Sequence, residues 1–186
     1  MTAKDLAILT RALINKFPNL YTIFAEPSFT YSNIRQGNRN PLLYKNMGAD
    51  GLKTGYTKAA GYGLAASAKR KDRRLNLVVN GLTSVNQRSR ESQRLLSWGF
   101  REFDNYALFK AGEEITSVPV WLGDTKAVSL VLEEALTITI PRKARRSLKV
   151  SVHFRGPIPT PIFKGQEVAI LRITAKNINT IELPLT

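Results

Sequence analysis

Apolar side chains recur every three or four residues near the N-terminus, at Leu6, Leu9, Leu13 and Phe17. This is the spacing of one face of an α-helix. Thr2 and Asp5 stand three residues apart, as the two members of a capping box do, and Pro18 ends the pattern. The sequence therefore predicts a helix over residues 2–17.

After this helix the sequence favours extended backbone structure. Residues 29–44 favour strand structure, interrupted by a polar turn at residues 37–41 that contains Gly, Asn and Pro. Residues 50–57 then predict a turn that leads into a strand.

A hairpin and a second helix follow. Apolar residues predict strands at 63–68 and 75–82, and the charged segment 69–74 between them predicts the hairpin tip. A helix is expected over residues 86–103 because apolar residues return to helical spacing there. The side chains expected to be buried on this helix are Leu95, Leu96, Phe100 and Phe103.

After Tyr106 the pattern changes to short runs rich in Val, Ile, Leu and Thr, separated by Gly, Pro or charged residues. Regular short strands without helices predict a small antiparallel sandwich or barrel. The expected strands are residues 117–122, 128–132, 136–140, 148–154, 168–174 and 180–185. We place a domain boundary near Ala107, with an α+β region over residues 1–107 and an all-β, sandwich-like domain over residues 108–186.

The net charge of +14 is the strongest compositional signal. Residues 1–107 carry 17 basic and 7 acidic side chains, whereas residues 108–186 carry 11 and 7. A positive field attracts nucleic acid, anionic lipid or anionic cell-wall polymer, and composition alone does not choose among them.

Several kinds of chemistry are excluded by residue type. The chain has no cysteine, so disulfides, thiol catalysis and cysteine-bound metal are absent. Its one histidine, His153, lies in a strand pattern, which argues against a Ser-His-Asp triad or a histidine metal site. Residues 61–66 match a dinucleotide-binding Gly-x-Gly-x-x-Ala pattern, but they lead into a strand rather than a helix. We expect neither a metal nor a cofactor.

Lys53-Thr54-Gly55 is the motif that carries chemistry. Lys-Thr-Gly on a strand is one of three active-site elements of serine penicillin-binding proteins and β-lactamases, beside Ser-x-x-Lys and Ser-x-Asn. A lysine ammonium favours the anionic species of acyl transfer, and a threonine hydroxyl can donate a hydrogen bond to a substrate carboxylate. Glycine leaves the strand edge open for a peptide. Three residues alone are weak evidence, so the surrounding sequence decides whether Lys53-Thr54-Gly55 is an active-site motif or a chance match.

The surroundings resemble the D-alanyl-D-alanine carboxypeptidases, which are low-molecular-mass penicillin-binding proteins. The resemblance rests on residues 38–40, 50–57, 60–68, 88–92 and 95–100, and it continues through 119–124 and 136–142 into a β-rich second domain. It implies an α+β portion of a penicillin-binding transpeptidase domain, followed by a small all-β domain. It also implies a bacterial periplasm or cell-envelope location.

The resemblance implies roles for particular residues. Lys53 matches a catalytic position, and Thr54 and Gly55 match substrate-binding positions of the third motif. Arg39 and Arg88 match arginines at the rim of the site, and Arg88 is expected to recognise the substrate carboxylate because a guanidinium suits a bidentate pair. An ordinary surface salt bridge is the alternative role for either arginine.

The nucleophile is missing from this sequence. No serine is followed by lysine three residues later, and Ser84-Val85-Asn86 lies after Lys-Thr-Gly, where we interpret it as a helix cap. We therefore expect a C-terminal portion that begins after the other two motifs. Its first region should need a complementary N-terminal half or a second copy to cover its apolar faces.

Two functions remain, and a third is set aside. The parent protein would be a serine-type carboxypeptidase that removes the terminal D-alanine of peptidoglycan pentapeptides and binds β-lactams. Alternatively, this chain is a non-catalytic binding or scaffold fragment of the cell envelope. The basic clusters at residues 69–74 and 142–146 lack interleaved aromatic residues and match no nucleic-acid-binding motif, so no nucleic-acid partner is expected.

Overall fold

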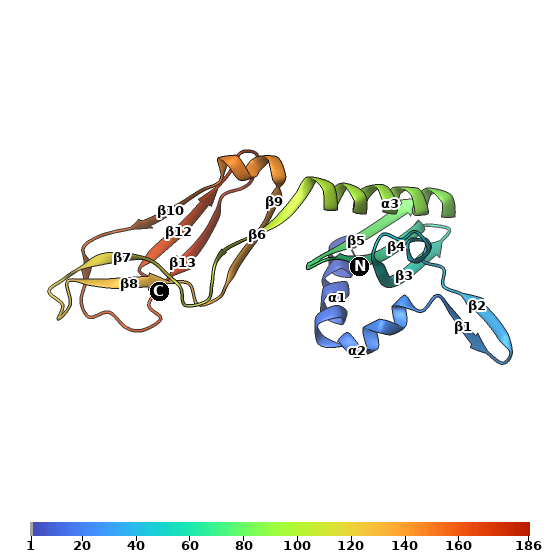
Figure 1. The fold of residues 1–186 in the computed structure, drawn as a ribbon, viewed down its shortest axis with the longest axis horizontal. Coiled ribbons are helices and arrows are strands. Elements are labelled where there is room, and N and C mark those ends of the chain that lie inside the picture. Colours follow the sequence, from blue (N-terminus) through green and yellow to red (C-terminus); the bar gives the residue numbers. More distant parts are fainter. Residues whose placement is uncertain (1) are drawn as a thin grey trace. The chain divides into compact units, whose positions relative to one another are not determined.

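The computed structural model describes residues 2–186 and divides the chain into two compact units (Figure 1). Unit 1 ends at Arg101 and unit 2 begins at Glu102. The expected boundary near Ala107 lies inside strand β6 (Phe103–Phe109), which pairs with β9 (Leu136–Pro141) of unit 2.

Unit 1 begins with helical segments. Helix α1 spans Ala3–Lys16, and Thr2 and Asp5 form the predicted capping box at its start. Helix α1 ends before Pro18, as predicted, and Pro18 is the first residue of a second short helix, α2 (Pro18–Tyr21), followed by the 3-10 helix η1 (Thr22–Ala25). Proline is tolerated there because the first residues of a helix need no amide donor.

The next segment differs from the prediction. Strands β1 (Ser28–Tyr31) and β2 (Ile34–Gly37) form a hairpin whose turn is Ser32-Asn33, both with positive φ. The predicted turn at residues 37–41 lies after this hairpin, and Pro41–Tyr44 forms a 3-10 helix, η2, rather than a strand.

A three-stranded antiparallel sheet is the centre of unit 1. Its order is β3 (Ala49–Thr57), β4 (Gly61–Arg70), β5 (Arg73–Leu82), so β3 is an edge strand. The predicted hairpin of β4 and β5 is confirmed, with a tip reduced to Lys71-Asp72. Figure 1 shows helix α3 (Val85–Glu102) along one face of the sheet and α1 on the other.

Helix α3 matches the predicted second helix, with a difference in what it buries. Leu96 and Phe100 join the sheet in a core with Leu42, Met47 and Leu64. Leu95 and Phe103 are only partly buried, and Arg88 and Ser92 take the remaining buried positions of the helix. Arg88, Ser92 and Leu96 lie four residues apart, so they share one face of the helix.

Unit 2 is all-β. All six predicted strands are present, as β7 (Glu114–Trp121), β8 (Ala127–Val131), β9, β10 (Lys149–Phe154), β12 (Ala169–Thr174) and β13 (Ile181–Leu185). Two strands were not predicted: β6, and the two-residue β11 (Ile158–Pro159), which pairs with β7 in parallel. The sheets are β11-β7-β8, β10-β12-β13 and β6-β9.

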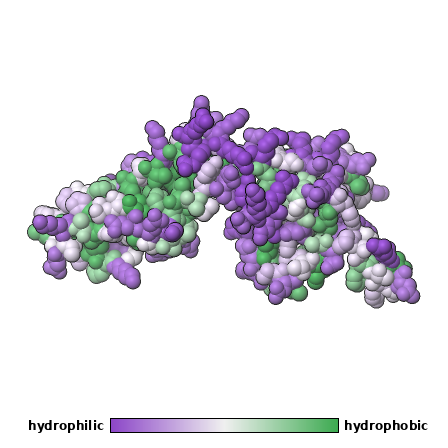
Figure 2. All heavy atoms as spheres, in the orientation of Figure 1, coloured by the Kyte–Doolittle hydropathy of each residue, from purple (hydrophilic) through white to green (hydrophobic). Residues whose placement is uncertain are grey.

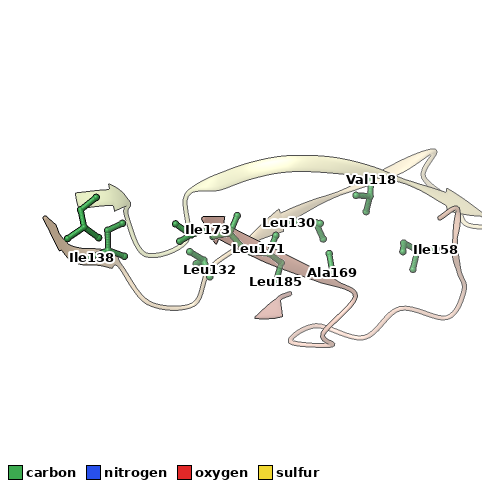
Figure 3. Packing of buried hydrophobic residues seen from close by; sticks show 10 residues of the cluster. Val118, Leu130, Leu132, Ile138, Ile158, Ala169, Leu171, Ile173 and Leu185 are labelled. Atoms are coloured by element: carbon green, nitrogen blue, oxygen red, sulfur yellow. The ribbon is translucent and has the colours of Figure 1, made fainter. Parts of the chain in front are cut away.

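The core of unit 2 lies between these sheets. Figure 3 shows Val118, Leu130 and Ile158 facing Ala169 and Leu171 across the interior. The basic cluster at residues 142–146 lies in the 3-10 helix η3 (Arg142–Ser147), and Figure 2 shows hydrophilic side chains gathered over it. The Arg145 guanidinium lies 5.1 Å from the centre of the Tyr106 ring. No helix within residues 2–186 has the length and apolarity needed to cross a bilayer.

Candidate active-site edge

Lys53, Thr54 and Gly55 lie on the edge strand β3, as the sequence predicted for a Lys-Thr-Gly motif. Lys53 is exposed, and its ammonium donates a hydrogen bond to the Thr54 carbonyl at 3.1 Å. A Cβ placed on Gly55 would meet no atom within 4 Å, so the space beside it is open. The motif therefore presents a cation and an unobstructed strand edge.

The two side chains of the motif lie on opposite faces of the sheet, because side chains alternate along a strand. Thr54 pairs with Leu64 of β4, which is buried in the core beneath α3, and Thr54 itself is only 9% exposed. Lys53 is turned toward the other face. Any ligand that contacts both side chains must therefore lie along the strand edge.

Aromatic rings extend the Thr54 face. Tyr56 of β3 stands opposite Tyr62 of β4, and their ring centres are 4.3 Å apart. The guanidinium of Arg88 lies over the Tyr62 ring at 5.7 Å from its centre. Thr54 and the Tyr56–Tyr62–Arg88 stack thus belong to the same side of the sheet, at the strand end that follows the motif.

Arg88 is an unusual cation because it is 6% exposed and its Nε has no hydrogen-bond partner among the described residues. Burial lowers the pKa of the Arg88 guanidinium from its usual value. One turn later the buried Ser92 hydroxyl also lacks a partner within residues 2–186. Unsatisfied buried donors are costly, and a carboxylate is the group that best satisfies a guanidinium.

Arg39 lies in a segment tied to the same strand. Its side chain is exposed between Asn38 and Asn40. The Asn38 amide donates to the carbonyls of Phe24 and Glu26, and the Asn40 amide donates to the Gly51 carbonyl of β3 at 2.7 Å. Asn40 is 1% exposed, so this bond is a buried connection between the Arg39 segment and the start of the motif strand.

A polar cluster precedes the motif and was not predicted. Arg74 of β5 forms two 2.7 Å contacts with the Asp50 carboxylate, through Nη1 to Oδ1 and Nη2 to Oδ2. The Tyr21 hydroxyl donates to Asp50 Oδ1 at 2.9 Å, and Arg74 also donates to the buried Ser67 hydroxyl. Burial raises the pKa of Tyr21 to about 12, and the Asp50 carboxylate adds to the effect.

These partners come from four separate segments, which explains why the sequence pattern did not reveal them. Tyr21 lies 29 residues before Asp50, and Arg74 lies 24 residues after it. A local signal existed only for the neighbouring Asn40 contact with Gly51. The Asn-x-Asn-Pro sequence of residues 38–41 indicates side chains that bond to backbone groups.

No group of three or more potential metal-ligating side chains occurs within residues 2–186.

Two protein families match the chain. Residues 1–84 match the family described as D-alanyl-D-alanine carboxypeptidase, and residues 103–186 match the C-terminal domain of penicillin-binding protein 5. Curated relatives include the D-alanyl-D-alanine carboxypeptidases DacA and DacC of Escherichia coli (strain K12), 42% and 43% identical over 172 residues. Each match covers 91% of this chain and 43% of the relative, so the chain spans less than half the length of these relatives.

Solved structures give the same result. Penicillin-binding protein 5 from Haemophilus influenzae is 34% identical, with a TM-score of 0.90 over 100% of this chain and 55% of its own. Ampicillin-bound penicillin-binding protein D2 from Listeria monocytogenes is 32% identical, with a TM-score of 0.51 over 54% of this chain and 41% of its own. These matches confirm the predicted fold class and the resemblance.

The family matches over residues 1–84 and 103–186, the curated relatives and the solved structures point to the same proteins. The chain is therefore similar to the C-terminal portion of the D-alanyl-D-alanine carboxypeptidases, with residues 1–84 matching that family and residues 103–186 matching the penicillin-binding protein 5 C-terminal domain.

Proposed function

We propose that this chain supplies the Lys-Thr-Gly side of the active site of a serine-type D-alanyl-D-alanine carboxypeptidase. The substrate would be a peptidoglycan pentapeptide, from which the terminal D-alanine is removed through an acyl-enzyme in the bacterial periplasm or cell envelope. The observation that carries the proposal is Lys53-Thr54-Gly55 on an open sheet edge, in a chain whose relatives are named as these carboxypeptidases.

The geometry suggests a division of roles. Lys53, exposed on one face, would place its ammonium beside the nucleophile and stabilise the anionic species of acyl transfer. The substrate would lie along the edge beside Gly55. Thr54 and Arg88, on the other face, would bind its terminal carboxylate, because Arg88 has a buried Nε without a partner in the described chain. Arg39 would contribute positive charge at the rim.

Residues 1–186 do not contain the nucleophile of this reaction, because no serine is followed by a lysine three residues later. Without an activated serine no acyl-enzyme forms. A non-catalytic binding or scaffold role is the second candidate, and this missing motif is the observation that favours it. Ampicillin occupies the Listeria relative, which makes a β-lactam the appropriate probe for deciding between them.

The test joins this chain to the N-terminal part of E. coli DacA, because the match covers only 43% of that relative. Fluorescent penicillin is added to the fusion and to the chain alone, and covalent adducts are measured by denaturing electrophoresis and intact mass. We expect an adduct on the fusion and none on the chain. Lys53→Ala in the fusion should slow acylation by roughly 100-fold, the order seen when one charge-stabilising donor is lost.

Lys58→Ala is the matched control, since Lys58 is an exposed lysine in the turn that follows β3. It should leave acylation of the fusion unchanged. An adduct on the chain alone would show that another residue acts as nucleophile. A fusion that folds but never acylates, or that acylates equally well with Lys53→Ala, would refute the catalytic proposal and leave the scaffold role.

A further inference from the structure

The strand that carries Lys53-Thr54-Gly55 contains an irregularity three residues before the motif. Ala49 pairs with Ala68 of β4, but Gly51 pairs with the adjacent Ser67. Asp50 is therefore the extra residue of a β-bulge, with no partner of its own on β4. A bulge shifts the alternation of side chains by one position, so it determines which face each following residue takes.

The side chain of this extra residue is held by two residues from other elements, Arg74 and Tyr21. The Asp50 carboxylate accepts hydrogen bonds from Arg74 of β5 at 2.7 Å and from the Tyr21 hydroxyl of α2 at 2.9 Å. Arg74 bonds at 2.7 Å to the hydroxyl of Ser67, a completely buried residue of β4 that faces the bulge. The charged pair is bidentate, and this geometry fixes orientation as well as distance.

The backbone of the bulge is held as well. The buried Asn40 amide donates to the Gly51 carbonyl at 2.7 Å. A Cβ on Gly51 would lie 2.5 Å from the Tyr21 hydroxyl oxygen, so Tyr21 reaches Asp50 only because residue 51 is glycine. Residues from α2, β4, β5 and the Asn40 segment thus meet at Asp50-Gly51.

This arrangement matters because β3 is an edge strand. It is paired on one side only, by β4, and an edge strand without other restraints is free to slip or fray. A slip of one residue would exchange the faces of Lys53 and Thr54. The contacts at Asp50 hold the strand at the point where its register is decided.

We propose that Asp50, together with Tyr21 and Arg74, is a positioning group that locks the β3 bulge and thereby fixes the faces on which Lys53 and Thr54 stand. The contribution to acylation rests on the proposed function above. Asp50 touches no reacting atom in this role. Its effect passes through the backbone of residues 51–54 to the lysine ammonium.

The first test uses the 186-residue chain and needs no activity. Amide hydrogen exchange is measured for Asp50→Asn, Tyr21→Phe and Arg74→Lys, residue by residue. We expect the amides of residues 51–56 to exchange about tenfold faster in each variant, because local opening becomes easier. Amides of β5 and α3 should change only as much as global stability does. Asp72→Asn, which removes an exposed carboxylate at the β4–β5 tip, should leave residues 51–56 unchanged.

The second test measures acylation of the DacA fusion by penicillin in the same variants. Asp50→Asn should reduce the acylation rate about tenfold at a temperature where the fusion is fully folded, with Arg74→Lys retaining more of the rate than Asp50→Asn. If the fusion of unaltered sequence is never acylated, the catalytic proposal fails, yet the exchange pattern still decides whether Asp50 locks β3.

Two results would overturn the inference. One is an exchange increase spread evenly over unit 1, which would mark Asp50 as a general stabilising residue. The other is unchanged exchange in residues 51–56. Should Asp50→Asn fail to fold, Tyr21→Phe decides alone, because it removes one hydrogen bond and leaves the Asp50–Arg74 pair in place.

Discussion

The Tyr21 hydroxyl is buried and donates a hydrogen bond to the Asp50 carboxylate. Burial and the neighbouring negative charge both oppose ionisation of the hydroxyl. Burial raises the pKa of Tyr21 to about 12, from a value near 10 for an exposed tyrosine. The unfolded chain therefore releases this proton more readily than the folded chain above pH 10. The stabilising effect of the neutral hydroxyl is complete below pH 10 and declines as pH rises toward 12.

Alkaline unfolding should reveal this group. Between pH 9 and pH 11, Tyr21 should account for a loss of about 1.4 kcal/mol in the free energy of unfolding, since one pKa unit corresponds to about that amount. Denaturant unfolding of unit 1 is followed by Trp98 fluorescence in a Trp121→Phe background. Tyr21→Phe should be less stable at pH 9 but should lose less stability on going to pH 11.

Tyr31→Phe provides the comparison, because Tyr31 is an exposed tyrosine of β1. It should retain the full alkaline loss of the unaltered chain. Equal losses in Tyr21→Phe and in the unaltered chain would show that Tyr21 ionises at the same pH whether the chain is folded or not.

At the scale of elements, the first turn of α3 connects stability to the proposed carboxylate site. The Ser84 hydroxyl accepts a hydrogen bond from the Gln87 amide at 3.1 Å, as predicted for a helix cap. The Gln87 side chain in turn accepts from the Thr83 amide at 2.7 Å. Arg88 follows directly, so these contacts hold the turn from which its guanidinium reaches Tyr62.

Ser84→Ala should lower the free energy of unfolding of unit 1 by about 1 kcal/mol, the usual cost of losing a cap. It should also speed amide exchange in residues 85–90 more than in the middle of α3. Asn86→Ala, an exposed substitution in the same turn, is the control and should change stability by less than about 0.5 kcal/mol. Similar losses in both variants would mean that Ser84 is not the cap that matters.

The elements that the sequence predicted well are those in which one physical signal dominates. Helix α1 and the β4–β5 hairpin have clear periodicity and chemically distinct ends. The β1–β2 turn was missed because Ser32 and Asn33 both adopt positive φ, and neither is the glycine that usually indicates such a turn in a sequence. Strand β6 was missed because Asp104 and Asn105 interrupt its apolar pattern, and η3 was missed because its basic residues show no apolar periodicity.

In the candidate site, too, the sequence predicted the part with a local signal and missed the part that depends on distant residues. Lys53-Thr54-Gly55 is local in sequence and could be recognised, and its place on a strand was predicted. The bulge at Asp50 could not be predicted, because it depends on a pairing with Ser67 and on partners more than 20 residues away. Long-range polar contacts leave no periodic pattern in a sequence, whereas a short motif can be recognised from its consecutive residues.

At the scale of the whole chain, the two units differ in how completely they cover their apolar residues. Unit 2 encloses its core between its own sheets (Figure 3). Unit 1 leaves many large apolar side chains exposed on its helices and its first hairpin, namely Ile8, Leu9, Phe17, Leu20, Ile23, Phe29, Tyr31 and Ile34. Exposed apolar surface of this kind marks a contact region, and a complementary N-terminal segment or a second copy remains the predicted partner.

The difference predicts two unfolding transitions rather than one. Each unit has a separate buried core, so each should unfold cooperatively, with unit 1 at the lower temperature because it buries less of its apolar surface. Residues 102–186 produced alone should melt within about 4 °C of the upper transition of the full chain, since a difference below about 0.5 kcal/mol shifts a domain of this size by no more than that. Fusion to the DacA segment should raise the lower transition and leave the upper one in place, because we expect the segment to cover exposed apolar side chains of unit 1. A single transition shared by both units, or a fragment 102–186 that does not fold, would show that the cores depend on each other.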